Sequence, residues 1–374
     1  MANVISHACQ LPSGPTTLIL PGDMQWALSD TAPTKPVIAA APQASTEEIE
    51  HAAAALRSGP TAVVLGGSAL RSEGLKAADR IQRATDCHIF TPTFPPVQDR
   101  GIGLISPEKI PYAPEPATKL LAPFEKVILA GAHEPVAFFG YPNTRSSLCS
   151  EDATIIEMCR DTVDPASALV AVADALGAPP ARHAPSAPRP EAPRGPLSPS
   201  SMCAAIAAAQ PDGAIVMDEG ATAGFGYHGM AAGAPPFTYM ALTGGSIGQG
   251  LPCAVGAAAA EPSRTTICLE GDGSSLYTIQ ALWTMARENQ NVTSIICKNK
   301  AYSILRWELE RANMTPGNAS LSLTALESPE FNYVKLAEGF GVEGRAVTTA
   351  EELNDTLEYA FKSPGPFLIE ADLV

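Results

Sequence analysis

The sequence is poor in basic residues. Its 374 residues include 24 lysines and arginines against 39 aspartates and glutamates, a formal net charge of −15. A chain this acidic lacks the basic surface that binds nucleic acid or anionic membranes, so we expect neither partner. It also has no run near the roughly 18 uncharged apolar residues that span a bilayer, and no basic-then-apolar leader in MANVISHACQ. We therefore expect a cytoplasmic protein.

The cysteines show no spacing that indicates a metal or redox site. Eight are scattered along the chain, and no two form a CxxC pair or accompany a histidine at ligand spacing. Isolated cysteines of this kind are most often small buried side chains. The chemistry of this protein must therefore be sought in other residue types.

What the chain does contain is two stretches in which short apolar runs alternate with helical patterns. The first has TLIL, TAVVLGG, HIFTP, KVILAGA and TIIEMC, and the second has GAIVMDE, TYMALTGG, TTICLEGDG, TSIICKN and PFLIEA. This alternation predicts the α/β class, with two doubly wound parallel-sheet domains. Between them Ala178–Ser200 contains eight prolines and almost nothing that could pack into a core, which predicts an extended linker. The predicted organisation is a domain at 1–177, a linker at 178–200 and a domain at 201–374.

Two short motifs in the first stretch are informative about structure. Ser45 and Glu48 have the spacing of a capping box and predict a helix start. Gly66 and Gly67 follow TAVVL like the glycine turn of a nucleotide-binding domain, but the complete GxGxxG is absent. Cofactor binding there is therefore not the favoured interpretation, and a nicotinamide or flavin site remains the alternative.

The strongest chemical signal lies at the ends of two apolar runs in the second stretch. Asp272 stands between Gly271 and Gly273 after TTICLE, and Asn299 follows TSIICK 27 residues later. That spacing fits one helix plus one strand of a right-handed crossover, and the ends of neighbouring strands lie about 5 Å apart. A carboxylate and an amide oxygen at one point suit Mg²⁺ with a diphosphate. The structural alternative is that both are loop residues that bond their own backbone.

The surrounding motifs resemble the thiamine-diphosphate-dependent family of acetolactate synthase, benzoylformate decarboxylase and pyruvate decarboxylase. GDGSSLYTIQALWTMAR, KNKAYSILRW and GGSIGQGLP are similar to the diphosphate-binding domain of that family, from about residue 196 to the C-terminus. The resemblance implies thiamine diphosphate and Mg²⁺ as cofactors. It also implies decarboxylation of a 2-oxo acid, followed by protonation or carboligation.

The resemblance also implies roles for individual residues. Asp272 and Asn299 would be the side-chain ligands of Mg²⁺, and the Ala301 carbonyl would be its backbone ligand. Gly273 and Ser274 would donate hydrogen bonds to the diphosphate. The other implied cofactor-binding residues are Thr222 near the diphosphate, Gly245 with a carbonyl toward the aminopyrimidine, Ser246, Ile247 as the prop of the bent cofactor, Gly271 and Tyr302.

The chain departs from the family pattern at two places. Lys298 stands where most relatives have an asparagine. The family order is pyrimidine-binding, central and diphosphate-binding domain, whereas residues 1–12 here resemble the exit from the first of these. We therefore expect the pyrimidine-binding domain and its activating glutamate to be absent from this chain, and we assign no catalytic residue. A separate pyrimidine-domain chain could supply them; the alternative is a non-catalytic or truncated cofactor-binding module.

The central domain of the family is Rossmann-like, and residues 12–176 resemble it without a convincing flavin motif, so FAD is not expected. His133 lies near a stretch where benzoylformate decarboxylase carries a histidine, but Gly140 falls at that place, and we expect a surface role for His133. Because active sites of this family form between subunits, the resemblance implies a homodimer or homotetramer.

Four further residues of the second stretch carry open or structural interpretations. Asp218 and Glu219 could line the predicted cleft or serve a turn or helix start, and the residues alone favour neither. Trp283 and Trp307 are expected to be core aromatics rather than substrate platforms.

Overall fold

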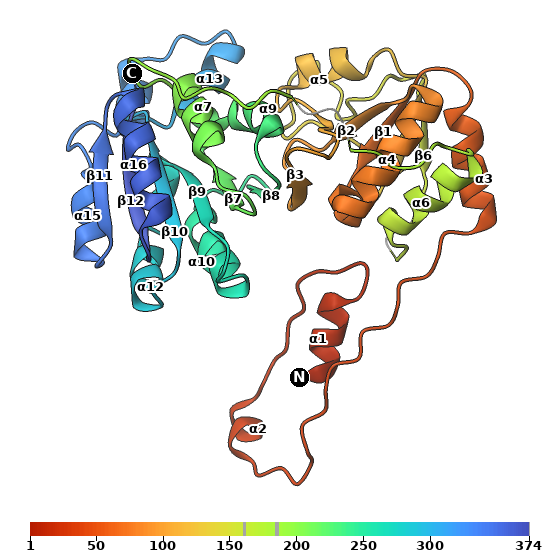
Figure 1. Cartoon of the computed structure of the whole chain (residues 1–374), viewed down its shortest axis with the longest axis horizontal. Coiled ribbons are helices and arrows are strands. Elements are labelled where there is room, and N and C mark those ends of the chain that lie inside the picture. The colour runs from red at the N-terminus through yellow and green to blue at the C-terminus, as the bar shows by residue number, and fades with distance from the viewer. Residues whose placement is uncertain (160–161, 184–186, 374) are drawn as a thin grey trace. The chain divides into compact units, whose positions relative to one another are not determined.

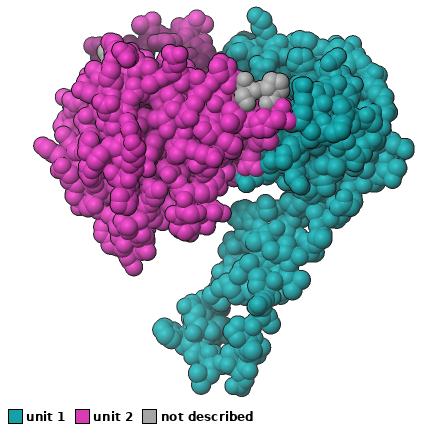
Figure 2. All heavy atoms as spheres, in the orientation of Figure 1, with its two compact units in different colours: residues 1–93, 107–182 teal, residues 94–106, 183–374 magenta. Residues whose placement is uncertain are grey.

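The computed structural model describes residues 1–159, 162–183 and 187–373. The chain divides into two compact units, shown in two colours in Figure 2: unit 1 comprises 1–93 and 107–182, and unit 2 comprises 94–106 and 183–374. Both units are α/β with parallel sheets, which confirms the predicted class. The predicted linker at 178–200 is shared between the two units, with 178–182 in unit 1 and 183–200 in unit 2.

Unit 1 is built on a five-stranded parallel sheet in the order β4-β2-β1-β5-β6. Figure 1 labels β1, β2 and β6 of this sheet. Its strands are β1 (Thr61–Leu65), β2 (His88–Thr91), β4 (Glu108–Lys109), β5 (Lys126–Ala130) and β6 (Thr154–Glu157). Its helices are α1 (Ala2–Cys9), α2 (Gly22–Trp26), α3 (Thr46–Leu56), the 3₁₀ turn η1 (Gly67–Leu70), α4 (Ser72–Thr85), α5 (Pro114–Leu121) and α6 (Pro165–Ala175). β1 is buried along its whole length, as expected for a parallel strand in the middle of a sheet that helices cover.

The start of unit 1 contains one confirmed and one wrong prediction. The capping box of Ser45 and Glu48 is present at the start of α3. The strand predicted at 17–20 is not formed, and Ile19 is 83% exposed. An apolar run becomes a strand only where a neighbouring strand accepts its backbone hydrogen bonds, and TLIL has no such neighbour among the described residues.

Unit 2 is built on a seven-stranded sheet in the order β11-β12-β10-β9-β7-β8-β3, parallel except for β3. Its strands are β3 (Gln98–Arg100), β7 (Ile215–Glu219), β8 (Phe237–Ala241), β9 (Thr266–Gly271), β10 (Val292–Lys298), β11 (Glu343–Val347) and β12 (Phe367–Asp372). Its helices are α7 (Pro199–Ala209), α8 (Ala221–Gly224), α9 (Tyr227–Met230), η2 (Ala231–Gly233), α10 (Gly250–Ala260), α11 (Asp272–Ser275), α12 (Ala281–Arg287), α13 (Ser303–Arg311), α14 (Asn318–Thr324), α15 (Tyr333–Gly339) and α16 (Ala350–Lys362).

Two apolar layers enclose the sheet of unit 2. Ile295 and Ile369 point into a core with α7 and α16, whereas their neighbours Ile296 and Leu368 point into a core with α10, α12 and α15. Figure 1 shows α7 and α16 together over the sheet, with α10 and α12 near its opposite end. Because the strands are buried on both faces, their sequences are continuous apolar runs, and the polar residues collect at the strand ends.

The edge strand β3 comes from a distant part of the sequence. Residues 94–106 belong to unit 2, and β3 pairs antiparallel with β8. Arg100 is 2% exposed, donates to Ser106 Oγ (2.9 Å) and lies 5.7 Å from the ring centre of Tyr239. The domain boundary predicted at residue 177 missed this insertion of residues 94–106 into unit 2. A three-residue strand is too short to show the alternating pattern that would have revealed it.

The proline-rich segment packs more than predicted. Leu197 is fully buried in the core of unit 2, and its amide donates to the Thr348 carbonyl at 3.2 Å. Arg189 donates to the Gln210 carbonyl at 2.7 Å. The expectation of a segment without core contacts is therefore wrong at its C-terminal end; residues 184–186 of that prediction lie outside the described residues. None of the helices in the described ranges is long and apolar enough to cross a membrane.

Candidate functional site

The two predicted oxygen ligands follow neighbouring strands. β9 and β10 pair in parallel, with Cys297 opposite Gly271, so Asp272 and Asn299 both emerge at the same edge of the sheet. The predicted adjacency of these strands is confirmed. The two turns are also bonded to each other, because the Lys300 amide donates to Asp272 Oδ2 at 2.6 Å.

Asp272 is fixed in a buried turn. Asp272 is only 3% exposed, and its Oδ1 accepts a hydrogen bond from the Gly273 amide at 2.9 Å. Its own carbonyl accepts from the hydroxyls of Ser275 (2.7 Å) and Tyr333 (2.9 Å). Burial raises the pKa of Asp272 above its usual value, and the amides of Lys300 and Gly273 offset part of that rise. A cation beside this carboxylate would stabilise its charged form.

The neutral oxygens of the predicted ligand set lie in the turn after β10. Asn299 Oδ1 accepts from the Ala301 amide at 3.1 Å. Ala301 lies opposite Ala325 in an antiparallel β-bridge. The two hydrogen bonds of this bridge use the Tyr302 amide and the Lys300 carbonyl, so the Ala301 carbonyl takes no part in it. Within the described ranges no group of three His, Cys, Asp or Glu side chains could hold a metal. A cation at this edge would therefore rely on one carboxylate and neutral oxygens.

The glycine-rich loop before α10 lies against the same turn. Gly244, Gly245 and Gly248 have φ of +65°, +64° and +93°, a region that favours glycine. These left-handed residues are incompatible with an α-helix, and α10 begins after them, at Gly250. The Gly248 carbonyl accepts from the Thr278 hydroxyl at 2.7 Å. The loop thus contacts the segment that follows the Asp272 turn.

Within this loop and turn the predicted cofactor residues differ in exposure. Gly245 and Ser246 are exposed and Ile247 is half-buried, whereas Gly271, Gly273 and Ser274 are buried. A Cβ at Gly273 would lie 2.3 Å from the Tyr302 ring, so the ring packs directly on the turn. Thr222 is half-buried in α8, which packs beside β9.

The helix predicted after the Asp272 turn is interrupted. Residues 276–280 form turns, and α12 covers only Ala281–Arg287. Trp283 is 52% exposed, and the Arg287 guanidinium lies 5.4 Å from its ring centre. The expectation of a core role for Trp283 is therefore wrong. Trp307, on α13, is half-buried.

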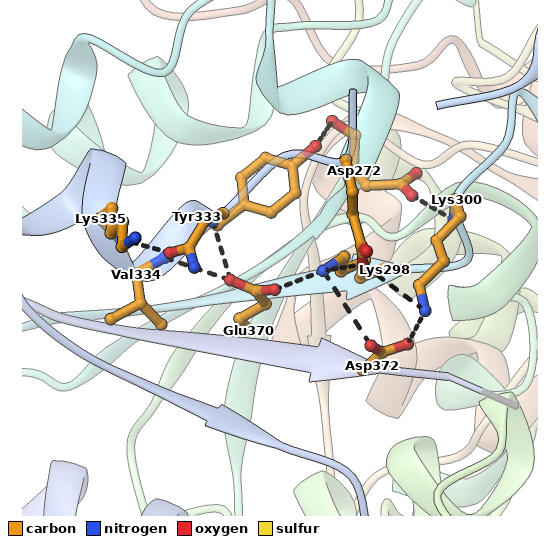
Figure 3. A network of polar contacts seen from close by, with 10 residues as sticks. Asp272, Lys298, Lys300, Tyr333, Val334, Lys335, Glu370 and Asp372 are labelled. Atoms are coloured by element: carbon orange, nitrogen blue, oxygen red, sulfur yellow. Dashed lines mark hydrogen bonds and ion pairs between the residues drawn. The ribbon is translucent and has the colours of Figure 1, made fainter. Parts of the chain in front are cut away.

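Lys298 takes part in a buried ion-pair network next to the site (Figure 3). Its Nζ lies 2.6 Å from Glu370 Oε1 and 2.8 Å from Glu330 Oε1, with only 7% of its side chain exposed. Glu370 also accepts from the Tyr333 amide at 2.8 Å and so holds the start of α15. Lys300, which is more exposed, pairs with Asp372 at 2.9 Å. Acidic residues thus neutralise both lysines beside the Asp272 turn.

Asp218 and Glu219, left open by the sequence, have structural partners. Asp218 accepts from the Tyr239 hydroxyl (2.8 Å) and the Gly220 amide (3.1 Å). Glu219 is 1% exposed and accepts from the Gly248 and Gly250 amides at the start of α10. These contacts match the turn and helix-start interpretation.

Glu270 was not predicted as part of the site. A charged residue near the end of an apolar strand could have indicated it. It lies opposite Glu219 in the register of β9 and β7 and is fully buried. Its Oε1 has no hydrogen-bond partner in the part of the chain that the structure describes. Burial first, and then the charge of Glu219, raise the pKa of Glu270 well above its usual value.

Of the two candidate glycines of unit 1, Gly66 serves packing. A Cβ at Gly66 would lie 2.1 Å from the Gly131 carbonyl oxygen, so the ends of β1 and β5 meet there without side chains. A cavity of about 590 Å³ opens beside them, with Glu134, Glu157 and Asp164 in its wall. Their negative charge would repel the pyrophosphate group of a dinucleotide. His133, also in the wall, is exposed as expected.

Comparison with known proteins supplies an independent line of evidence. Residues 222–371 match the family model "Thiamine pyrophosphate enzyme, C-terminal TPP binding domain". IlvX of Mycobacterium tuberculosis, which carries the name of an acetolactate synthase large subunit, is 42% identical over 357 residues, 95% of this chain and 69% of its own length. Benzoylformate decarboxylase of Pseudomonas aeruginosa is 37% identical over 199 residues, 51% of this chain and 36% of its own length.

A solved structure agrees in fold. The thiamine diphosphate-dependent 4-hydroxybenzoylformate decarboxylase of Rhodococcus jostii RHA1 superposes with a TM-score of 0.73 at 23% identity, over 99% of this chain and 72% of that one. At this identity the likeness concerns the fold alone. The chain thus spans about seven tenths of IlvX and of this structure, and about a third of the benzoylformate decarboxylase.

Proposed function

The chain belongs to the thiamine-diphosphate-dependent enzymes, and from that premise we propose that it binds thiamine diphosphate together with Mg²⁺ and acts on a 2-oxo acid. The observation that carries this proposal is the adjacency of β9 and β10, which delivers Asp272 and Asn299 to one edge of the sheet. The donor set suits Mg²⁺, since this ion combines one or two protein side chains with phosphate oxygens and water.

We propose the following division of labour among the residues. Asp272, Asn299 and the Ala301 carbonyl would hold the ion, and Gly273 and Ser274 would hold the diphosphate, with the Gly271 turn, Thr222 and Tyr302 beside it. Gly245, Ser246 and Ile247 would support the rest of the cofactor from the loop before α10. When bound, thiamine diphosphate supplies a thiazolium ring that stabilises the carbanion left by decarboxylation.

The binding part of the proposal is tested by Asp272→Ala. Thiamine diphosphate is titrated calorimetrically into wild type and variant in MgCl₂. We expect affinity to fall about a hundredfold, as for the loss of a buried charged partner. Asp355→Ala, at an exposed position of α16, is the matched control and should bind like wild type. Equal affinity of wild type and Asp272→Ala would refute the assignment.

The reaction itself is proposed more coarsely, as decarboxylation with either protonation or carboligation. The alternative is a module that binds the cofactor without turnover, because nothing in the sequence matches the family's activating glutamate. CO₂ release from pyruvate or benzoylformate is measured with this chain alone. It is then measured after addition of a pyrimidine-binding domain from a relative. Turnover by the chain alone would exclude the non-catalytic alternative, and light scattering of the same sample tests the proposed homodimer or homotetramer.

A further inference from the structure

The glycine-rich loop of residues 244–249 contains almost no side chain that could hold it in place by packing. Gly244, Gly245 and Gly248 are left-handed, and Ser246 is exposed. Glycine segments lose more conformational freedom than others when they are ordered. A loop of this composition needs bonds from outside if it is to keep Ile247 in one position.

Some of these bonds come from the loop itself. The Gln249 side chain accepts from the Thr243 hydroxyl at 2.8 Å and donates to the Thr243 and Ser246 carbonyls at 2.8 and 2.7 Å. These hydrogen bonds join the two ends of the loop, because Thr243 precedes it and Gln249 is its last residue. They do not fix the loop relative to the sheet.

Glu219 makes the connection to the sheet. It is the last residue of β7, and its two carboxylate oxygens accept separately from the Gly248 and Gly250 amides. The Ser274 hydroxyl of the Asp272 turn also interacts with it. A single buried carboxylate therefore joins three elements: the end of β7, the loop before α10 and the turn after β9.

The chain is shaped to admit both buried carboxylates, Glu219 and Glu270. A Cβ at Gly250 would lie 3.0 Å from Glu219 Oε2 and 2.1 Å from Glu270 Oε2, so residue 250 must be glycine for the backbone to approach. Bonds from amides to a carboxylate are about twice as strong as neutral ones. The two bonds, one from Gly248 in the loop and one from Gly250 at the start of α10, hold the C-terminal end of the loop.

We propose that Glu219 is the positioning residue of the loop 244–249 and thereby sets the place of Gly245 and Ile247. This role rests on the proposed function, because the loop matters chemically only if it carries the cofactor. Glu219 itself is buried behind the loop and is assigned no contact with cofactor or substrate.

The register partner of Glu219 provides a matched control. Glu270 is equally buried and lies on the adjacent strand, but its Oε1 has no partner among the described residues. Glu219→Gln replaces an acceptor oxygen with an NH₂ group that faces an amide donor, and so breaks a bond to the loop. Glu270→Gln makes the same change of shape at a carboxylate whose Oε1 carries no bond among the described residues and whose backbone partner is the Leu251 amide of α10, outside the loop 244–249.

The first measurement is hydrogen exchange on the cofactor-free full chain. In Glu219→Gln we expect amides 245–250 to exchange about tenfold to a hundredfold faster than in wild type, as for the loss of hydrogen bonds to a charged group. The rest of unit 2 should keep its rates. Glu270→Gln should match wild type over amides 245–250, and the Leu251 amide, which donates to Glu270, is left out of the comparison. Unchanged exchange in the loop of Glu219→Gln, or equal acceleration in Glu270→Gln, would overturn the proposal.

The second measurement is calorimetric titration of thiamine diphosphate with MgCl₂ into the same proteins. Affinity should fall about tenfold in Glu219→Gln and stay within about twofold in Glu270→Gln. If wild type itself does not bind, the proposed function fails, whereas the exchange experiment still decides the role of Glu219. Should Glu219→Gln not fold, Glu219→Asp, which keeps the charge and shortens its reach, takes its place with a smaller expected acceleration confined to the same amides.

Discussion

At the end of β1 in unit 1 and of β9 in unit 2, a glycine follows a buried apolar strand of a parallel sheet. In unit 1 Gly66 meets the carbonyl of Gly131, and the neighbouring strand ends close on each other. In unit 2 Gly271 and Gly273 flank a carboxylate, and a ring rather than a backbone lies against the second glycine. The same architecture therefore carries a packing contact in one place and a candidate ion site in the other, which shows that site chemistry must be argued from residues and not from fold.

The surroundings widen this difference. The cavity beside Gly66 has carboxylates of Glu134 and Glu157 in its wall. Beside Asp272, by contrast, two lysines are already paired with acidic partners. At the strand end of unit 2 the described lysines are thus already paired, so a metal ion would make an anionic ligand favourable there.

The largest expected effect on stability comes from removing the buried positive charge of Lys298, the last residue of β10. Lys298→Met would leave Glu370 buried without its cation (Figure 3) and should lower the free energy of unfolding by about 3 to 5 kcal/mol. Burial alone would lower the pKa of Lys298, but Glu330 and Glu370 raise it above its ordinary value. The stabilisation that charged Lys298 gives the folded protein is therefore fully present below the ordinary lysine pKa. It is lost only as the pH rises through the higher pKa of the folded state. Urea unfolding at pH 7 measures all of it.

Two variants serve as controls for that measurement. Lys300→Met removes a more exposed ion pair with Asp372 and should cost at most about 1 kcal/mol. Adding Glu370→Gln to Lys298→Met should recover much of the loss, because the unpaired charge is then gone. Equal costs for the two lysines would mean that burial of the network is not what matters.

The next effect tests the closed strand end of unit 1. In Gly66→Ala the new methyl group would meet backbone atoms of Gly131 and Ala132 at 2.1 to 2.7 Å. Backbone in a sheet cannot move aside cheaply, so we expect a loss of about 3 kcal/mol in urea unfolding. Gly140→Ala, which has open space around its Cβ, should be close to neutral. A tolerated alanine at position 66 would remove the packing explanation.

The smallest effect tests the corresponding glycine of unit 2. In Gly273→Ala the methyl group meets the ring of Tyr302 and not backbone, and a ring can rotate away, so the loss should be about 1 kcal/mol. Combining Gly273→Ala with Tyr302→Ala should cost less than the sum of the two single changes. Gly256→Ala, in open space on α10, should be neutral or stabilising. If Gly273→Ala proved as damaging as Gly66→Ala, the contrast between the two strand ends would fail.

Much of the fold was predictable from local patterns. Apolar runs such as those of β1, β9 and β10 are long and bounded by glycine or asparagine, and their order along the chain fixes a parallel sheet. The same patterns fail where pairing decides the outcome. TLIL has the composition of a strand but no partner, and β3 is too short to show a period although it is paired.

The sequence by itself determined the α/β class and the place of Asp272 and Asn299, because glycines, strand length and crossover length are local properties. Only the tertiary structure decided what the buried carboxylates do. Glu219 ends β7 and Glu270 is the last residue but one of the adjacent β9, yet Glu219 accepts from the Gly248 and Gly250 amides, whereas Glu270 has an oxygen without a partner among the described residues. Their difference arises from the path of a loop almost thirty residues away, and a hydrogen bond across that separation exists only once the chain is folded.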